Sequence, residues 1–90
     1  MKSELNPDFV GLFQQLPDRV KRTARKNYKL WKDNPSHPSL EFKEVNQEDQ
    51  IWSIRVGIGW RALGRIKSKN VIVWFWIGSH AEYDKLLKKL

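Results

Sequence analysis

The sequence from residue 71 to residue 90 reads VIVWFWIGSHAEYDKLLKKL and changes character at one point. Its first seven residues are all apolar, which is typical of a central β-strand buried on both faces. Ser79 and Glu82 follow with the spacing of a helix capping box, in which the two residues satisfy each other's backbone groups. The stretch therefore predicts a buried strand, with Trp74 and Trp76 on one face of it, that leads directly into a terminal helix.

Two side chains at the start of the predicted helix can take part in proton transfer. His80 and Tyr83 are three residues apart in its first turn and therefore lie roughly on one side. Histidine can accept and donate a proton near neutral pH, and tyrosine can donate one. Each also has a purely structural interpretation: His80 could be an exposed helix residue, and Tyr83 could begin an apolar stripe that continues with Leu86, Leu87 and Leu90.

Upstream of this stretch, apolar and polar residues alternate with the period of β-strands. Because successive strand residues point to opposite faces, the apolar set is expected to face the core and three arginines to share the other face. That face would be a basic surface edged by His80 and Tyr83 and suited to a phosphate, or it would be an ordinary solvated sheet face. The apolar set comprises Trp52, Ile54, Val56, Trp60, Ala62 and Ile66, and the arginines are Arg55, Arg61 and Arg65.

The N-terminal part of the chain shows helical periodicity instead. Asn6 and Pro7 are a favoured cap and first residue of a helix, and Pro17 is expected to start a second helix that ends before Pro35. No strand is predicted before Asn6. The apolar stripes of these helices are Phe9, Leu12, Phe13 and Leu16 in the first, and Val20, Ala24, Tyr28 and Trp31 in the second.

Together these segments predict an α+β fold in a single domain that spans residues 1–90. An N-terminal antiparallel helical hairpin would pack on a four-stranded, mainly antiparallel sheet, and a short C-terminal helix would follow the last strand. Short polar turns between the strands favour antiparallel connections. The strands are expected around residues 40–45, 52–56, 60–66 and 71–77.

The composition restricts the partners that such a domain can have. Seventeen Lys and Arg residues against ten Asp and Glu residues give a net charge of +7, which favours nucleic acid or an acidic protein as the partner. Cysteine is absent and the two histidines lie far apart in the sequence, so no metal or cofactor site is expected. With no signal-peptide pattern and no apolar run long enough to span a bilayer, a cytoplasmic location is expected.

Five short motifs, taken in order, resemble the RelE/ParE superfamily of bacterial toxin–antitoxin toxins and look closest to RelE- and HigB-like mRNA interferases. Each motif alone has little specificity, but their order and spacing extend over nearly the whole chain. The motifs are LP at residues 16–17, NPSHPSL at 34–40, WSIRV at 52–56, GWRAL at 59–63 and IGSHAEY at 77–83.

The resemblance implies a set of site residues. The family's phosphate-binding arginine matches Arg61, and a basic position on the preceding strand matches Arg55. The C-terminal active-site position matches His80, and the terminal catalytic or stacking tyrosine matches Tyr83. The chain departs from the family at Ser53, which stands where members carry a basic residue, and at its start, where members commonly have a β-strand.

The implied reaction is RNA cleavage without a metal ion. The 2′-hydroxyl attacks the adjacent phosphorus, a base takes its proton, cations stabilise the phosphorane, and an acid protonates the leaving 5′-oxygen. Arg61 and Arg55 would hold the phosphate, and His80 would act as the base or the acid. Tyr83 would stack on a nucleobase or transfer the second proton.

Further RNA contacts are expected outside this group. Arg65 would be an accessory phosphate contact. The second helix carries a basic face that could bind ribosomal RNA or could simply be solvated. The residues of this face assigned to RNA binding are Lys21, Arg25 and Lys29.

The sequence therefore predicts the toxin of a type II toxin–antitoxin pair, acting as a ribosome-dependent mRNA endoribonuclease that inhibits translation. Its expected partners are a cognate antitoxin, in a hetero-oligomer, and mRNA with the ribosome. Two alternatives stay open, namely a ParE-like toxin that inhibits DNA gyrase by binding and a catalytically silent RNA- or protein-binding module. The combination of Arg61, His80 and Tyr83 favours the nuclease.

Overall fold

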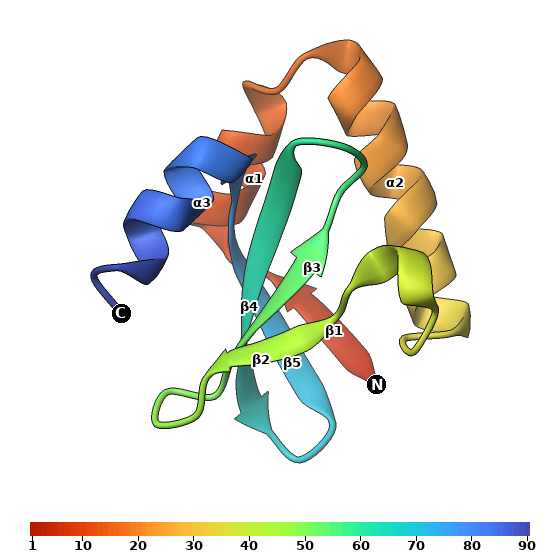
Figure 1. Cartoon of the computed structure of the whole chain (residues 1–90). Helices are drawn as coiled ribbons and strands as arrows, with labels where there is room; N and C mark the ends of the chain where they lie inside the picture. The colour runs from red at the N-terminus through yellow and green to blue at the C-terminus, as the bar shows by residue number, and fades with distance from the viewer.

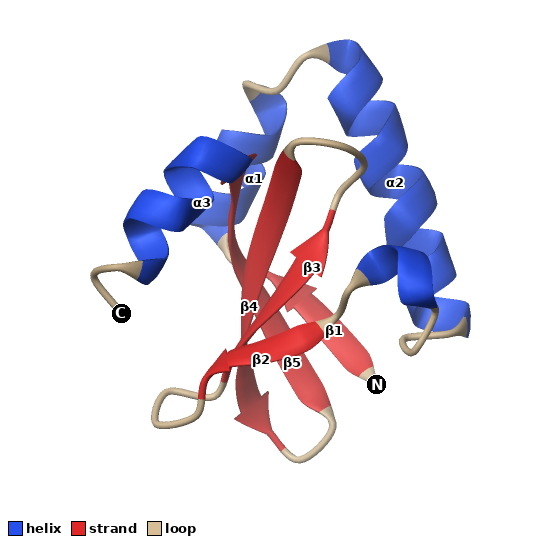
Figure 2. Cartoon of the chain, viewed as in Figure 1, coloured by secondary structure: helices blue, strands red, loops and turns tan.

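A computed structural model describes all residues from Met1 to Leu90. Its centre is a five-stranded sheet with the order β1-β5-β4-β3-β2, in which β1 runs parallel to β5 and the other neighbours are antiparallel (Figures 1 and 2). Three α-helices and one short 3₁₀-helix complete the fold. The elements are β1 (Lys2–Leu5), α1 (Pro7–Gln14), α2 (Asp18–Asp33), η1 (Pro38–Leu40), β2 (Lys43–Asn46), β3 (Ile51–Arg55), β4 (Trp60–Ser68), β5 (Val71–Ser79) and α3 (His80–Leu87).

The α+β class and the antiparallel connections of the last four strands are as predicted, but the prediction of four strands is wrong. Residues 2–5 form an additional edge strand, β1, whose ladder is continued by backbone hydrogen bonds from Lys2 to Asn70 and from Asn6 to Trp74. Its sequence, KSEL, shows no alternation of apolar and polar residues. Three of the four residues are exposed, so the strand does not need an apolar face. The strand is therefore specified by its pairing with β5 and not by a burial pattern.

The first predicted strand also begins later than expected. Leu40 lies in η1, and the ladder starts only at Lys43. His37 caps η1, since its Nδ1 accepts a hydrogen bond from the backbone N–H of Ser39 at 3.2 Å. Pro38 then occupies the first helical position, where its missing N–H has no cost. Leu40 is nevertheless fully buried. Its apolar side chain correctly indicated burial but did not indicate a strand.

The two N-terminal helices are present but do not form a closely packed hairpin. Asn6 caps α1, with its Oδ1 accepting from the N–H of Asp8 at 2.7 Å. Figure 1 shows α1 and α2 diverging from the loop that joins them in a wide V. A cavity of about 230 Å³, lined mainly by apolar side chains from both helices and the sheet, lies beneath them. None of the helices combines the length and the apolar composition needed to cross a bilayer.

The main core lies between the sheet and the N-terminal helices. It includes Trp31 of α2, whose ring meets that of Trp74 edge to face with centroids 5.4 Å apart. The apolar strand residues predicted to face the helices do pack in or against this core. Its buried members are Val20, Trp31, Leu40, Ile54, Val56, Ala62, Ile72, Trp74 and Ile77.

The opposite face of the sheet carries a second, smaller core. It consists of Ile51, Leu63 and Tyr83, and it is closed by α3. A bulge in β5 divides the two tryptophans of that strand: Leu63 pairs with Trp76 but Gly64 pairs with Trp74, so one residue of β5 is left over. Trp74 therefore enters the main core and Trp76 packs against the small one, which corrects the prediction that both share a face.

Candidate functional site

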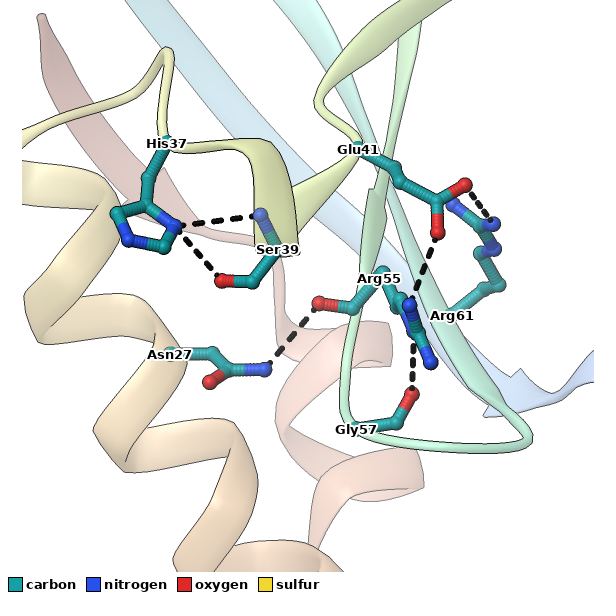
Figure 3. A network of polar contacts seen from close by, with 7 residues as sticks. All are labelled: Asn27, His37, Ser39, Glu41, Arg55, Gly57 and Arg61. Atoms are coloured by element: carbon teal, nitrogen blue, oxygen red, sulfur yellow. Dashed lines mark hydrogen bonds and ion pairs between the residues drawn. The ribbon is translucent and has the colours of Figure 1, made fainter.

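The site is built on a pair of arginines that stand directly opposite each other in neighbouring strands. Arg55 ends β3 and Arg61 is the second residue of β4, and the two form one register pair of the ladder. Like charges in this arrangement repel each other. Figure 3 shows that both guanidinium groups turn toward a single carboxylate, that of Glu41. This carboxylate offsets the repulsion, and the three side chains form one polar cluster.

Glu41 divides its two oxygens between the two arginines. Its Oε1 accepts from Arg61 Nη2 at 3.0 Å, and its Oε2 accepts from Arg55 Nη1 at 3.2 Å. The hydrogen bond from Arg61, followed by the positive charge of Arg61 and of Arg55, lowers the pKa of the Glu41 carboxyl below its ordinary value. Sequence reasoning missed this residue, because it treated the segment as a strand. Glu41 in fact follows η1 with a left-handed backbone, at φ 44°.

Arg61 is the buried member of the pair. Only 8% of its side chain is exposed, against 39% for Arg55. Its Nη2 binds Glu41, while its Nε and Nη1 have no hydrogen-bond partner within the protein. The hydroxyl of Ser53, which is fully buried on the same strand as Arg55, also lacks a partner. Buried donors without partners are costly, and they mark a position where an additional acceptor would be bound favourably.

Arg61 lies on the predicted face of the sheet, and its burial contradicts the alternative of an ordinary solvated face at this position. The face of the sheet that carries Arg61 is not exposed to solvent at this position, because α3 packs over it. The Cζ of Arg61 lies 5.5 Å from the centre of the Tyr83 ring, within the range of a cation–π contact. Tyr83 is itself only 4% exposed and packs with Ile51 and Leu63. The structural interpretation of Tyr83 as a core residue is therefore confirmed, and the residue also contacts Arg61.

His80 starts α3 at the edge of the same cluster. The capping box is confirmed: Ser79 Oγ accepts from the N–H of Glu82, and the Glu82 carboxylate accepts from the N–H of Ser79. The backbone N–H of His80 donates to Gly59 at 2.8 Å, which fixes the helix start to the β3–β4 turn. The ring centroids of His80 and Tyr83 are 5.7 Å apart, so Tyr83 contacts both Arg61 and His80.

The His80 ring is half exposed and lies near a carboxylate. Its side chain is 51% exposed, as the alternative reading of an exposed helix residue required. Its Nδ1 lies 3.2 Å from Asp84 Oδ2, one turn further along α3. A neutral imidazole has one nitrogen that donates a hydrogen bond and one that accepts. His80 and Arg61 both contact the Tyr83 ring, which brings this imidazole to the edge of the cluster.

The other predicted RNA-binding residues lie away from this cluster. Arg65 shares the face of Arg61 but stands four residues further along β4, about 13 Å away at strand spacing, where it covers the ring of Phe75 at 5.6 Å. Arg25 covers the ring of Phe13 at 5.2 Å, and Lys21 and Lys29 belong to the same helix, α2, which packs on the opposite face of the sheet. One contact joins α2 to the site, a hydrogen bond from Asn27 Nδ2 to the backbone oxygen of Arg55 (Figure 3).

The fold is a small α+β domain, and comparison with known proteins shows its family. Residues 18–85 match the profile of the ParE-like toxin domain, and the chain belongs to that family. This confirms the membership of the RelE/ParE superfamily that the motifs predicted. The comparison with curated protein sequences gives no significant match.

Solved structures of low sequence identity share the fold. A chain of the RelB–RelE antitoxin–toxin complex from Methanococcus jannaschii is 13% identical with a TM-score of 0.70, and the alignment covers 92% of this chain and 96% of that one. YafQ from Escherichia coli gives the same identity and TM-score over 91% and 96% of the two chains. For the toxin–antitoxin complex RelBE2 from Mycobacterium tuberculosis the identity is 17%, the TM-score 0.68 and the coverage 88% and 96%.

Proposed function

We propose that this protein is the toxin of a type II toxin–antitoxin pair and that it cleaves mRNA, in a ribosome-dependent manner, at the cluster of Arg55, Arg61, His80 and Tyr83. The observation that carries the proposal is the buried Arg61, which stands opposite Arg55 and has two guanidinium nitrogens without partners. A phosphodiester offers acceptor oxygens for such donors, and a buried guanidinium stabilises negative charge more strongly than an exposed one. The family membership supports the toxin role, and the resemblance implies the chemistry.

In the proposed reaction each residue has a separate task. Arg61 and Arg55 bind the non-bridging oxygens of the scissile phosphate and stabilise the phosphorane. The 2′-hydroxyl forms the new bond to phosphorus, its proton passes to Nε2 of His80, and the bond to the 5′-oxygen breaks. The leaving oxygen takes a proton from the imidazolium or from Tyr83. The products are a 2′,3′-cyclic phosphate and a free 5′-hydroxyl, and the need for a 2′-hydroxyl restricts the reaction to RNA.

The Asp84 carboxylate gives His80 its orientation in this scheme. A histidine that donates from Nδ1 to a carboxylate presents Nε2 as the acceptor, which is the arrangement that a general base needs. The pair is exposed, so its energetic contribution is small and its role is positional. Asp84 is therefore proposed as a positioning residue and not as a catalytic one.

The proposed partners follow from charge and from the relatives. Two of the structural relatives are antitoxin–toxin complexes, and a cognate antitoxin with an acidic segment would suit a chain with a net charge of +7. Lys21, Arg25 and Lys29 would face ribosomal RNA while the cluster faces mRNA, since the two groups occupy opposite faces of the sheet. Action inside the cytoplasm, where both RNAs are found, belongs to the same proposal.

The test is primer extension on mRNA from cells in which the protein is briefly expressed. Cleavage ends within translated codons are expected for the natural sequence and not for an Arg61→Ala/His80→Ala variant. Arg19→Ala is the matched control, because Arg19 is an exposed arginine of α2 outside the cluster, and it should cleave as the natural protein does. Growth arrest without any cleavage would contradict the nuclease and direct attention to gyrase, to be checked by DNA supercoiling. A folded protein that causes neither would support the silent binding module.

A further inference from the structure

The Glu41 carboxylate stands where the phosphate of the proposed reaction has to bind. It bridges Arg61 Nη2 and Arg55 Nη1 with its two oxygens, at 3.0 and 3.2 Å. A carboxylate that spans two guanidinium groups makes the same kind of charge-assisted contacts as the non-bridging oxygens of a phosphodiester. Both anions need the same N–H groups, those of Arg61 Nη2 and Arg55 Nη1, so only one of them can occupy this position between the arginines at a time.

The bridge is placed so that it can be released. The Glu41 side chain is 41% exposed, so its carboxylate can turn into solvent when it leaves the arginines. The residue belongs to the irregular segment between η1 and β2. Its backbone has a positive φ, which is unfavourable for residues other than glycine. No hydrogen bond other than those to the two arginines holds its carboxylate. A change of side-chain rotamer is therefore enough to uncover Arg61 and Arg55.

The bridge also leaves the arginines incompletely satisfied. Glu41 binds one nitrogen of the Arg61 guanidinium, and Nε and Nη1 remain without acceptors although the side chain is almost fully buried. A phosphate has more acceptor oxygens than a carboxylate and can offer acceptors to more of the donors of the two arginines. An incoming phosphate that displaces Glu41 thus gains contacts that Glu41 does not make.

We infer that Glu41 is a built-in competitor of the phosphate, which occupies the arginine pair in the free protein and must be displaced before RNA can bind. The inference rests on the proposed function for the identity of the anion as a phosphate of RNA. Displacement raises the concentration of RNA needed for binding, and it lowers the affinity of the site for small anions in the same way. Glu41 in this role lowers affinity and is itself not consumed or altered by the reaction.

The experiment is a calorimetric titration of the folded protein with inorganic phosphate. Glu41→Gln is expected to bind phosphate about tenfold more tightly than the natural protein, which corresponds to about 1.4 kcal/mol. Glu44→Gln is the matched control, because Glu44 is exposed on the adjoining strand β2, makes no ion pair and changes the net charge equally. Glu41→Asp keeps the charge but shortens the side chain, so that it cannot bridge both arginines, and it should also bind more tightly.

Each result decides between the possibilities. Equal affinities for Glu41→Gln and Glu44→Gln would reduce the effect to net charge and overturn the inference, as would weaker binding by Glu41→Asp. Far-ultraviolet circular dichroism confirms that each variant is folded, and Glu41→Asp carries the test if Glu41→Gln unfolds. Tighter phosphate binding in a protein that cleaves no RNA would uphold the competitor and refute the nuclease. Unchanged phosphate binding by Glu41→Gln, in a protein that does cleave RNA, would support the nuclease and overturn the inference about Glu41.

Discussion

Arg61 and Arg55 carry the same guanidinium group and pair with each other across neighbouring strands, yet their surroundings give them different tasks. Arg61 is enclosed by Tyr83, the sheet and Glu41, while Arg55 is anchored at the protein surface by a hydrogen bond from its Nε to the backbone oxygen of Gly57 at 3.2 Å. A buried charge interacts more strongly with an incoming anion than a solvated one does. The larger share of transition-state stabilisation is therefore assigned to Arg61.

Replacing each arginine by lysine separates these tasks. Arg61→Lys is expected to lower the single-turnover rate of RNA cleavage by a factor of about 100 or more, because lysine cannot present several N–H groups in a planar fork. Arg55→Lys should lower it by about tenfold or less. The rates are measured with a short RNA under conditions that support cleavage by the natural protein. Equal losses for the two variants would contradict the assignment.

The ion pair of Glu41 makes the stability of the fold depend on pH in a defined direction. The pKa of the Glu41 carboxyl is lowered from its ordinary value of 4.5 by the hydrogen bond and charge of Arg61. Above pH 4.5 the carboxylate is ionised in both the folded and the unfolded chain, and the folded state has the full benefit of the pair. As the pH falls from 4.5 through the lowered pKa, that benefit is lost, because the unfolded chain takes up a proton first.

The prediction concerns the difference in unfolding free energy between the natural protein and Glu41→Gln. This difference should be constant between pH 7 and about 5.5 and should shrink below pH 4.5. Urea unfolding at a series of pH values provides the measurement. Glu44→Gln, which removes a carboxylate with no ion pair, should show no such step, and a step of equal size there would rule out Glu41 as its source.

At the scale of the elements, β5 and α3 set the geometry of the site. The bulge in β5 sends Trp76 to the face of Tyr83, and the Trp76 ring lies across Gly78, where an added Cβ would come within 2.6 Å of it. Gly78 pairs with Arg61 in the ladder. Because Gly78 has no side chain, the Trp76 ring can lie over this position beside Arg61 and complete the small core.

Gly78→Ala tests this arrangement. The added methyl group forces Trp76 to move, and overpacking of this kind is expected to lower the unfolding free energy by about 1–3 kcal/mol and to disturb Tyr83. Gly11→Ala is the control, since an added Cβ in the middle of α1 meets no atom within 4 Å. It should leave stability unchanged or raise it by up to about 1 kcal/mol. Urea unfolding of both variants gives the comparison.

The sequence predicted the elements whose signals are local and missed those set by tertiary contacts. The capping box of Ser79 and Glu82 placed α3 to the residue, and alternation identified the faces of β3 and β4. The parallel partner of β5 could not be found, because KSEL has no pattern of its own. The bulge at Phe75 could not be found either, since all residues around it are apolar.

The same distinction explains what was missed in the site. Strand alternation put Arg55 and Arg61 on a common face, and the helix turn put His80 near Tyr83. The burial of Arg61 depends on how α3 folds back over the sheet, which no local pattern reports. Glu41 depends on the left-handed turn that ends η1. Both features require the assembled fold.

At the scale of the whole molecule, positive charge is distributed over both layers. The arginine pair lies on the α3 side of the sheet, and the basic face of α2 lies on the other. A protein that engages an RNA assembly with both surfaces should release more counterions than its active site alone accounts for. Binding to ribosomes is therefore expected to weaken steeply as salt concentration rises.

Removing two charges from α2 should reduce this dependence without affecting the site. In Lys21→Gln/Lys29→Gln, the slope of log affinity for ribosomes against log salt concentration should fall by about 1 per lost phosphate contact. Phosphate binding at the arginine pair should not change. Lys69→Gln, in the turn between β4 and β5, is the control for charge alone. An unchanged slope in the double variant would identify the basic face of α2 as a solvated surface.

The parallel pairing of β1 with β5 also has a consequence for the time at which the protein acquires its activity. Lys2 pairs with Val71 and Leu5 pairs with Trp74, so the sheet is completed by two segments of which one is synthesised well before the other. Contacts this distant in sequence form slowly, because a long loop has to close before they contribute stability. Arg61 is covered only when α3 has followed. During its own synthesis a nascent copy is thus expected to lack a finished site, which gives the proposed antitoxin an interval in which to bind it.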